Sequence, residues 1–256
     1  MPGPVGFFDG APPRVIAHRG LALECSENTL EAFRAALDAG ADILETDVQA
    51  SADGVAVLCH DDDLLSLAGI DQPVEALTAN RLLDVALVGG GRLATLREAL
   101  EAFPEVRFNI DVKTDAALLP TIAAIKDARA EQRVLVSSFR QRRRRRAVRA
   151  LAGCATSAST PGVVLCLVAA RLRLPPLVRF ALRRVDAVQV PRRRSGLTVV
   201  SPAFVRAVHR AGREVHVWTI NDPHEMRELL LNLRVDGIVT DRCDLLRDLL
   251  EPRKRA

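Results

Sequence analysis

The stretch DILETDV (residues 42–48) contains the pattern on which the fold prediction depends. Side chains alternate between the two faces of a β-strand, so Ile43, Glu45 and Asp47 share one face and residues 44, 46 and 48 share the other. In a barrel of parallel strands, one strand face contacts the surrounding helices and the other points inward, toward the mouth. The stretch therefore predicts a barrel strand that brings two carboxylates to the mouth.

The stretch VRFNIDVK (residues 106–113) sorts in the same way, with Asn109, Asp111 and Lys113 facing inward. Strands are predicted at residues 14–18, 42–48, 106–112, 133–137, 154–158, 185–190, 214–219 and 236–240. Helices are predicted at residues 28–39, 95–103, 115–130, 139–152, within 163–184, and at 201–211, 222–231 and 242–250. Eight β/α units predict an α/β fold with a single (β/α)8 TIM barrel. An open doubly wound sheet is the alternative, but no G-x-G-x-x-G turn follows the first strand.

Composition agrees with one folded globular domain. Of the 256 residues, 48% are hydrophobic and 27% are charged. We expect a single domain over residues 1–256, with its core at about 14–250. The first residues lack the regions of a secretory signal, no apolar run has the length of a membrane span, and the five cysteines include no C-x-x-C pair. A cytoplasmic location is therefore expected.

Two connections are longer than is usual in such a barrel. Residues 49–94 follow the second strand and contain a further strand-like run, GVAVLCH (residues 54–60), so an insertion is expected there. Residues 159–184 mix apolar residues with arginines around Pro175 and Pro176. This pattern favours a barrel helix with a kinked extension, and contact with a membrane surface or a lipid is the alternative.

The run RQRRRRRAVRA (residues 140–150) coincides with the fourth predicted helix. No aromatic residues alternate with these arginines to stack on bases, and no nucleic-acid-binding motif accompanies them. We therefore expect a solvated helix face and no nucleic-acid partner. The formal net charge of +4 is a weak indication of anionic partners.

Glu45, Asp47 and Asp111 should converge at the barrel mouth. Three clustered carboxylates repel one another unless positive charge balances them. A divalent cation would do so, and ligands that are all oxygen suit Mg²⁺, Ca²⁺ or Mn²⁺. The alternative is that Lys113 and neighbouring arginines balance the acids as salt bridges.

Two of the five histidines are expected at the same mouth. His18 ends the first strand, and His60 follows the strand-like run after the second. Imidazoles titrate near neutral pH and can serve as general acid and base. Arg19 and Lys113 add fixed positive charge suited to phosphate oxygens. Metal-binding acids beside phosphate-binding cations indicate phosphoryl chemistry.

These residues belong to an ordered series of short motifs. The series comprises His18-Arg19-Gly20, Glu27-Asn28-Thr29, Glu45-x-Asp47, His60-Asp61 and Asp111-x-Lys113, then VHVWTIND (residues 215–222) and VDGIVTDR (residues 235–242). From about residue 14 to 250 the chain resembles the glycerophosphodiester phosphodiesterase family, barrel enzymes related to the phosphatidylinositol-specific phospholipases C. The resemblance implies the same barrel fold and phosphodiester hydrolysis.

The resemblance also implies roles for individual residues. Glu45, Asp47 and Asp111 would hold a divalent metal, Ca²⁺ or Mg²⁺, with Glu27 as a further candidate ligand. Much of the family has Glu in place of Asp111, which leaves the metal's identity open. His18 and His60 would be the catalytic acid and base. Substrate contacts would come from Arg19, Lys113, Asn28 and Trp218. Asn28 or Ser26 alternatively caps the first helix.

The expected reaction is metal-dependent hydrolysis of small glycerophosphodiesters to an alcohol and glycerol 3-phosphate. A lysophospholipase D acting on single-chain lysophospholipids is the alternative within this chemistry, motivated by residues 159–184. A noncatalytic barrel that binds phosphorylated ligands is the alternative from another class. It is disfavoured because both histidines and all three acids are present.

Overall fold

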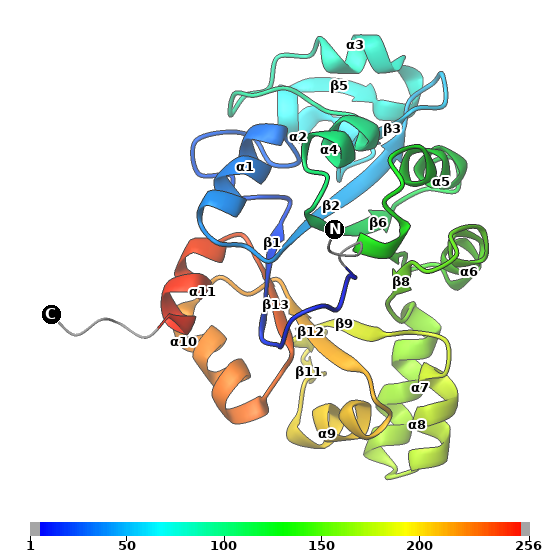
Figure 1. Ribbon diagram of the computed structural model, residues 1–256, viewed down its shortest axis with the longest axis vertical. Helices are drawn as coiled ribbons and strands as arrows, with labels where there is room; N and C mark the ends of the chain where they lie inside the picture. Colours follow the sequence, from blue (N-terminus) through cyan, green and yellow to red (C-terminus); the bar gives the residue numbers. More distant parts are fainter. Residues whose placement is uncertain (1–5, 252–256) are drawn as a thin grey trace, which may run out of the picture.

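The computed structural model describes residues 6–251 and contains a barrel of eight parallel strands (Figure 1). The strands are β1 (Arg14–His18), β2 (Ile43–Ala50), β6 (Arg107–Val112), β7 (Val134–Ser137), β8 (Ala155–Thr156), β9 (Ala187–Pro191), β12 (Glu214–Trp218) and β13 (Gly237–Thr240). Their order is β8-β7-β6-β2-β1-β13-β12-β9, and a parallel bridge from Ser157 to Ala187 joins the two ends of this order. The predicted α/β barrel is confirmed. The expected domain limits, residues 1 and 256, lie outside the described residues.

Helices follow the strands around the outside of the barrel (Figure 1). They are α1 (Leu30–Asp38), α4 (Leu96–Ala102), α5 (Leu118–Asp127), α6 (Gln141–Ala150), α7 (Thr160–Arg171), α8 (Pro175–Leu182), α9 (Pro202–Arg210), α10 (Pro223–Arg227), which continues as a π-helix (Glu228–Leu233), and α11 (Cys243–Leu250). Within residues 6–251, no helix is long and apolar enough to cross a membrane.

Strand alternation separates two cores. Leu44 on β2 and Phe108 on β6 are fully buried in the large core that the outer helices cover. Inside the barrel, Phe7 from the chain before β1 packs with Ile16 and Ile43. Apolar side chains thus fill the base of the barrel. The polar inward residues are left at the opposite end, where the strands finish.

The N-cap of helix α1 lies one residue after Asn28 and three residues after Ser26, the two expected caps. Thr29 is the N-cap, and its hydroxyl accepts a hydrogen bond from the backbone of Ala32 at 3.1 Å. The Ser26 hydroxyl instead accepts a hydrogen bond from the backbone N–H of Gly89 at 3.2 Å. Asn28 has a positive φ of 56° and lies outside the helix. The capping interpretation of Ser26 and Asn28 is therefore wrong.

The connection after β2 folds as a small layer of its own. It contains β3 (Ala56–Leu58), β4 (Asp63–Leu64), α2 (Leu65–Ala68), β5 (Ile70–Pro73), a 3-10 helix (Val74–Ala76) and α3 (Ala79–Leu83). β3 pairs antiparallel with the end of β2, so this connection stays attached to the barrel. Val57, Leu64 and Leu82 are fully buried in its separate apolar cluster. This layer positions the loop that carries His60.

The arginine-rich stretch and the segment after β8 differ from expectation. Residues 160–182 form two helices, α7 and α8, and not one kinked helix, because Pro175 and Pro176 open a new helix. The arginine run does form α6, but its face is only partly solvated. Arg143 and Arg144 are buried, and Arg143 donates to the backbone carbonyl of Val112 at 2.9 Å.

Candidate active site

The carboxyl ends of the strands surround a cavity of about 550 Å³. One side of its lining is polar and contains His18, Arg19, Glu45, Asp47, His60, Asn109, Asp111 and Lys113. The other side is largely apolar and contains Phe139, Val163, Val164, Leu167, Leu197 and Trp218. The cavity therefore brings together nearly all the predicted site residues. Glu27 and Asn28 are not part of its lining.

Parallel pairing sets the acids in two levels. Glu45 lies opposite Asn109 and also opposite His18, whereas Asp47 lies opposite Asp111 one level nearer the mouth. The inward direction predicted for these side chains is confirmed, since all line the cavity. Strand register, and not the loops, therefore fixes the spacing of the carboxylates.

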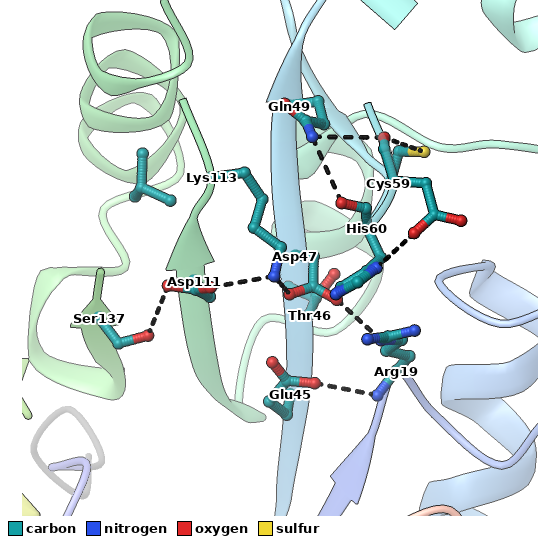
Figure 2. Close-up of polar contacts among 12 residues, drawn as sticks. Arg19, Glu45, Thr46, Asp47, Gln49, Cys59, His60, Asp111, Lys113 and Ser137 are labelled. Carbon is teal, nitrogen blue, oxygen red and sulfur yellow. Dashed lines mark hydrogen bonds and ion pairs between the residues drawn. The ribbon is translucent and has the colours of Figure 1, made fainter. Parts of the chain in front are cut away.

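Asp47 is the centre of an ion-pair network (Figure 2). Its Oδ2 lies 2.8 Å from Arg19 Nε, and its Oδ1 lies 2.8 Å from Lys113 Nζ. Lys113 Nζ also donates to Asp111 Oδ2 at 3.1 Å, and the outer side of Arg19 contacts Glu27 Oε1 at 2.8 Å. Burial lowers the pKa of Lys113, but Asp47 and Asp111 outweigh it, so the pKa is raised. Arg19 and Lys113 therefore stay charged, and both contact the carboxylate of Asp47.

Glu45 and Asp111 receive less compensation. Burial, reinforced by the neighbouring Asp47, raises the pKa of Glu45 to about 8. Burial also raises the pKa of Asp111, although Lys113 opposes the shift. The backbone N–H of Arg19 donates to Glu45 Oε2 at 3.2 Å, and His18 Nε2 is 4.0 Å from the same oxygen. These two buried carboxyl groups, whose charge is less fully balanced than that of Asp47, are a donor set that suits a hard divalent cation.

Most acidic side chains of the site form ion pairs with Arg19 and Lys113 and are not arranged as a set of metal ligands. Within residues 6–251, no three His, Cys, Asp or Glu side chains are grouped closely enough to hold a metal ion. Asp47 is engaged by Arg19 and Lys113, and Glu27 by Arg19. Asp111 contacts one cation, Lys113, whereas Asp47 contacts two. Glu45 and Asp111 are thus the side chains best suited to a cation, and Asp47 could join them only by exchanging its present partners.

His18 is held by residues from the last part of the barrel. Its Nδ1 is 2.7 Å from Asp241 Oδ1, just beyond β13, and Asn221 Nδ2 donates to Asp241 Oδ2 at 2.6 Å. A carboxylate accepts, so Nδ1 carries the proton and Nε2 faces the cavity. Burial lowers the pKa of His18, but Asp241 and Glu45 together raise it above the ordinary value.

His60 is held in a matching way by residues of the connection after β2. Its Nδ1 is 2.6 Å from Asp61 Oδ1, while Ser66 donates to the other oxygen of Asp61. Gln49 at the end of β2 is nearly fully buried, and its amide donates to the backbone carbonyls of His60 and Asp61, both at 3.3 Å (Figure 2). The same amide donates to Asp62 Oδ1 at 2.9 Å. Both imidazoles therefore present Nε2 away from an orienting carboxylate.

The turn after β1 needs unusual backbone. Arg19 has a φ of 57° and Gly20 a φ of 89°. A Cβ on Gly20 would lie 2.6 Å from the backbone carbon of Ala32, so α1 can approach only because residue 20 is glycine. Asn28 supports this turn: its backbone donates to the Arg19 carbonyl at 2.9 Å, and its Oδ1 accepts from Thr46 at 2.7 Å.

Trp218 ends β12 at the apolar side of the cavity. Its ring packs edge-on against Phe139, with centroids 6.2 Å apart. Phe139 is half exposed and was not singled out in the sequence, because it lies in a loop and has no motif around it. The two rings form an aromatic part of the cavity lining.

Sequence reasoning missed several polar residues. Asp241, Asn221 and Gln49 orient the two histidines, and Ser137 donates to Asp111 Oδ1 at 3.2 Å. A signal was available for two of them, because Asn221 and Asp241 lie in the motifs VHVWTIND and VDGIVTDR. Gln49 and Ser137 have no local signal and are recognised only through their partners.

Known proteins match this chain over nearly its full length. The sequence profile of the glycerophosphoryl diester phosphodiesterase family matches residues 18–245. A Mycobacterium tuberculosis protein named "Probable glycerophosphodiester phosphodiesterase 2" is 41% identical over 244 residues, covering 93% of this chain and 90% of that protein. Lysophospholipase D GDPD1 of Rattus norvegicus is 25% identical over 273 residues, covering 93% and 86%.

The fold comparison agrees with the sequence comparisons. The structure of an Oleispira antarctica phosphodiesterase in complex with its product sn-glycerol-3-phosphate superimposes with a TM-score of 0.73, at 24% identity, covering 94% of this chain and 98% of that one. The profile match and the mycobacterial relative both span the barrel and its mouth. This chain therefore belongs to the glycerophosphoryl diester phosphodiesterase family, a family of phosphoric diester hydrolases.

Proposed function

We propose that this protein hydrolyses glycerophosphodiesters to an alcohol and glycerol 3-phosphate with His18 and His60 as the acid-base pair. One observation carries the proposal: two imidazoles, each with Nδ1 bound to a carboxylate, line one cavity together with two cations. A lone buried histidine has many structural explanations, but two oriented histidines beside Arg19 and Lys113 match phosphodiester chemistry.

The orienting carboxylates decide which nitrogen reacts. Because Asp241 and Asp61 hold Nδ1 of their histidines, proton transfer takes place at Nε2 in both cases. One Nε2 accepts the proton of the attacking oxygen, and the other donates a proton to the departing alcohol. Attack by a glycerol hydroxyl would release a cyclic glycerophosphate before hydrolysis, whereas direct attack by water would not, so a quenched reaction separates the two routes.

Arg19 and Lys113 are the groups that would bind the phosphate. Both contact Asp47 at 2.8 Å, and both line the cavity. An entering phosphate competes with Asp47 for these cations and gains charge-assisted hydrogen bonds. The same contacts then offset the negative charge that develops on the phosphoryl oxygens in the transition state.

A divalent metal is part of the proposal. Glu45 and Asp111 would hold it, with Asp47 joining them once its cations turn to the phosphate, and Glu27 remains with Arg19. When bound, the ion would polarise a phosphate oxygen and lower the pKa of a hydroxyl group. The raised pKa values of Glu45 and Asp111 support this assignment, because a cation would stabilise their ionised forms.

The apolar side of the cavity favours lysophospholipase D activity as a second candidate. Val163 and Leu167 on α7 line the same cavity as His18. A glycerophosphodiester without a hydrocarbon chain would make no apolar contact with these side chains, whereas an acyl chain would bury them. Trp218 also lines this cavity and would contact the glycerol part in either case.

The test is a release assay over matched substrates. Glycerophosphocholine, glycerophosphoethanolamine and lysophosphatidylcholine are compared, with EDTA and with added Ca²⁺, Mg²⁺ or Mn²⁺. We expect choline release that EDTA abolishes and one of the metals restores. Activity insensitive to chelation would contradict the metal assignment, and a metal-replete protein inactive on every diester would favour a noncatalytic barrel.

A further inference from the structure

The charge of the molecule is divided unevenly along the chain. Residues 132–213 hold nineteen arginines, no lysine and a single acid, Asp186, and so carry a net charge of +18. The rest of the chain holds seventeen basic and thirty-one acidic residues, a net charge of −14. The small overall charge of +4 therefore conceals a strongly basic segment of the chain.

Most of these arginines lack an acidic partner. Fourteen of the nineteen are exposed. In the part of the chain that the structure describes, only Arg143 and Arg192 of this stretch form ion pairs, and neither is exposed. The exposed ones lie mainly on α6, at the α7–α8 turn, on α8 and on the hairpin of β10 (Arg193–Arg194) and β11 (Leu197–Thr198). Their charge is free to act on an external anionic partner.

An apolar stripe runs among these arginines. Val164 and Val168 on α7 and Leu172, the C-cap residue of α7, follow one another at intervals of four residues, and they are 53%, 46% and 63% exposed. Helix residues four apart share a face, so the three form one continuous stripe. Seven of the thirteen large apolar side chains that are exposed within residues 6–251 lie between Phe139 and Leu197. Such clustering on a surface usually marks an interaction site.

The stripe continues into the active-site cavity. Val164 and Leu197 are exposed and also line the cavity. Arg171 at the end of α7 donates to the backbone carbonyl of Thr198 at 3.2 Å, which ties α7 to the β10–β11 hairpin. In Figure 1, α6, α7 and α8 occupy one side of the barrel. We call the exposed residues of these helices and of the hairpin the basic apolar face.

We propose that the basic apolar face docks the protein on an anionic lipid bilayer. Arginines pair with lipid phosphates, and the aliphatic side chains between them enter the interface between headgroups and hydrocarbon. The cavity then opens at the lipid surface. A nucleic acid would use the arginines but not the Val164–Leu172 stripe, so the bilayer is the partner that accounts for both observations. This inference goes beyond the proposed function, and binding can be measured without any reaction.

The experiment is vesicle co-sedimentation with the full chain. Vesicles of phosphatidylcholine alone are compared with vesicles in which phosphatidylglycerol replaces one third of it. We expect binding to the anionic vesicles, at least tenfold weaker binding to the neutral ones, and release as salt is raised. Hydrolysis of water-soluble glycerophosphocholine is assayed separately, so a failure of docking and a failure of the proposed function are distinguishable.

Two paired variants test the two components. Val168→Ser with Leu172→Ser should weaken binding by about three- to tenfold, and Arg173→Glu with Arg179→Glu should weaken it at least about tenfold. The matched controls are Leu119→Ser with Leu231→Ser, which are 65% and 67% exposed elsewhere, and Arg81→Glu with Arg227→Glu. The controls should bind like the unaltered chain.

Several outcomes would overturn the proposal. Equal binding to neutral and anionic vesicles, or no binding to either, would exclude an anionic bilayer as the partner. Equal losses in the control variants would show that the face is not specific. Tight binding of a DNA or RNA duplex without binding to phosphatidylglycerol vesicles would assign the basic surface to nucleic acid.

Discussion

Glu214 and Glu45 lie at opposite ends of the barrel, and the environments of the two ends shift the pKa of a carboxyl group in opposite directions. At the base, burial alone would raise the pKa of Glu214, but hydrogen bonds from Arg14 and His216 lower it to about 2. At the mouth, burial and the nearby Asp47 raise the pKa of Glu45 to about 8. The base compensates its buried charge within the fold. At the mouth, the buried carboxyl group of Glu45 is not compensated in this way, which is characteristic of a site that binds a ligand.

The same contrast extends to the neighbours of each glutamate. Arg14 is only 3% exposed, and its guanidinium donates hydrogen bonds to Glu214 and to the backbone carbonyl of Phe8. Arg14 is the first residue of β1, and Arg19 directly follows its last residue. Arg19 contacts two acids, but it lines an open cavity. Substitutions at the base should therefore affect stability, and substitutions at the mouth should affect activity.

The largest expected effect lies at the mouth. His18→Ala and His60→Ala should each lower kcat by about 10²- to 10⁴-fold, because each removes a proton-transfer group. Thermal unfolding should change little in either variant. Hydrolysis is followed by choline release from glycerophosphocholine.

A second substrate distinguishes the two histidines. With a p-nitrophenyl ester of glycerol 3-phosphate, the leaving group departs without a proton, so the variant that lacks the general acid should regain activity and the other should not. Near-normal turnover by either variant with glycerophosphocholine would remove that histidine from the mechanism.

The next effect separates the two glutamates. Glu214→Gln should lower the free energy of unfolding by about 3 kcal/mol, because Arg14 would lose its ionic partner in a buried position. The kcat should stay within about twofold of the original. Since the folded pKa of Glu214 is depressed to about 2, its contribution to stability is present above about pH 4.5 and is lost as the pH falls toward 2.

Glu45→Gln should abolish activity, and its effect on the pH dependence of stability should be opposite in sign to that of Glu214→Gln. A pKa raised to about 8 means that Glu45 favours the folded state below about pH 4.5, and that this contribution is lost as the pH rises through 8. In EDTA, the unaltered protein should therefore lose stability from pH 5 to 9, and the variant should lose less while being inactive. Denaturant unfolding at both pH values measures this. A steeper decline in the variant would contradict the assignment.

The fold was predictable because its signal is repeated. Eight strand runs and their helices can be recognised from the printed sequence, and an error at one boundary does not alter the count. The segment after β8 was predicted less well, because apolar residues and arginines without a clear period do not show that one helix ends at Arg171 and that Pro175 begins another. The Thr29 cap was missed because Ser26 and Asn28 are equally good caps by residue type.

The site was predictable where its residues follow strands and was hidden where they act through others. His18, Glu45 and Asp111 could be placed because alternation fixes their direction. The ion pairs of Asp47 were open to two interpretations, a metal site or a salt-bridge network, and only coordinates show which contacts form. Asp241 lies more than two hundred residues from His18, so no local pattern joins them.

A smaller effect is expected from the orienting acid. Asp241→Asn should lower kcat about tenfold, because an amide holds the Nδ1–H tautomer of His18 less firmly. Asp241 helps to raise the pKa of His18, so the limb of the pH–rate profile that belongs to His18 should move to lower pH. Asp236→Asn is the matched control, since Asp236 contacts the remote His209 at 2.7 Å. A loss of kcat without a shift of the profile would indicate a purely structural role.

The smallest effect concerns the apolar side of the mouth, which neither glutamate touches. Leu167→Ser removes an aliphatic group from the cavity lining, whereas Leu165→Ser changes the same helix outside that lining. Losing the apolar contact with an acyl chain costs about 1 kcal/mol. The kcat/KM for lysophosphatidylcholine should therefore fall about fivefold in Leu167→Ser only, while glycerophosphocholine should be turned over equally by both variants. An equal fall for both substrates would mean that α7 supports the barrel mouth and does not contact a hydrocarbon chain.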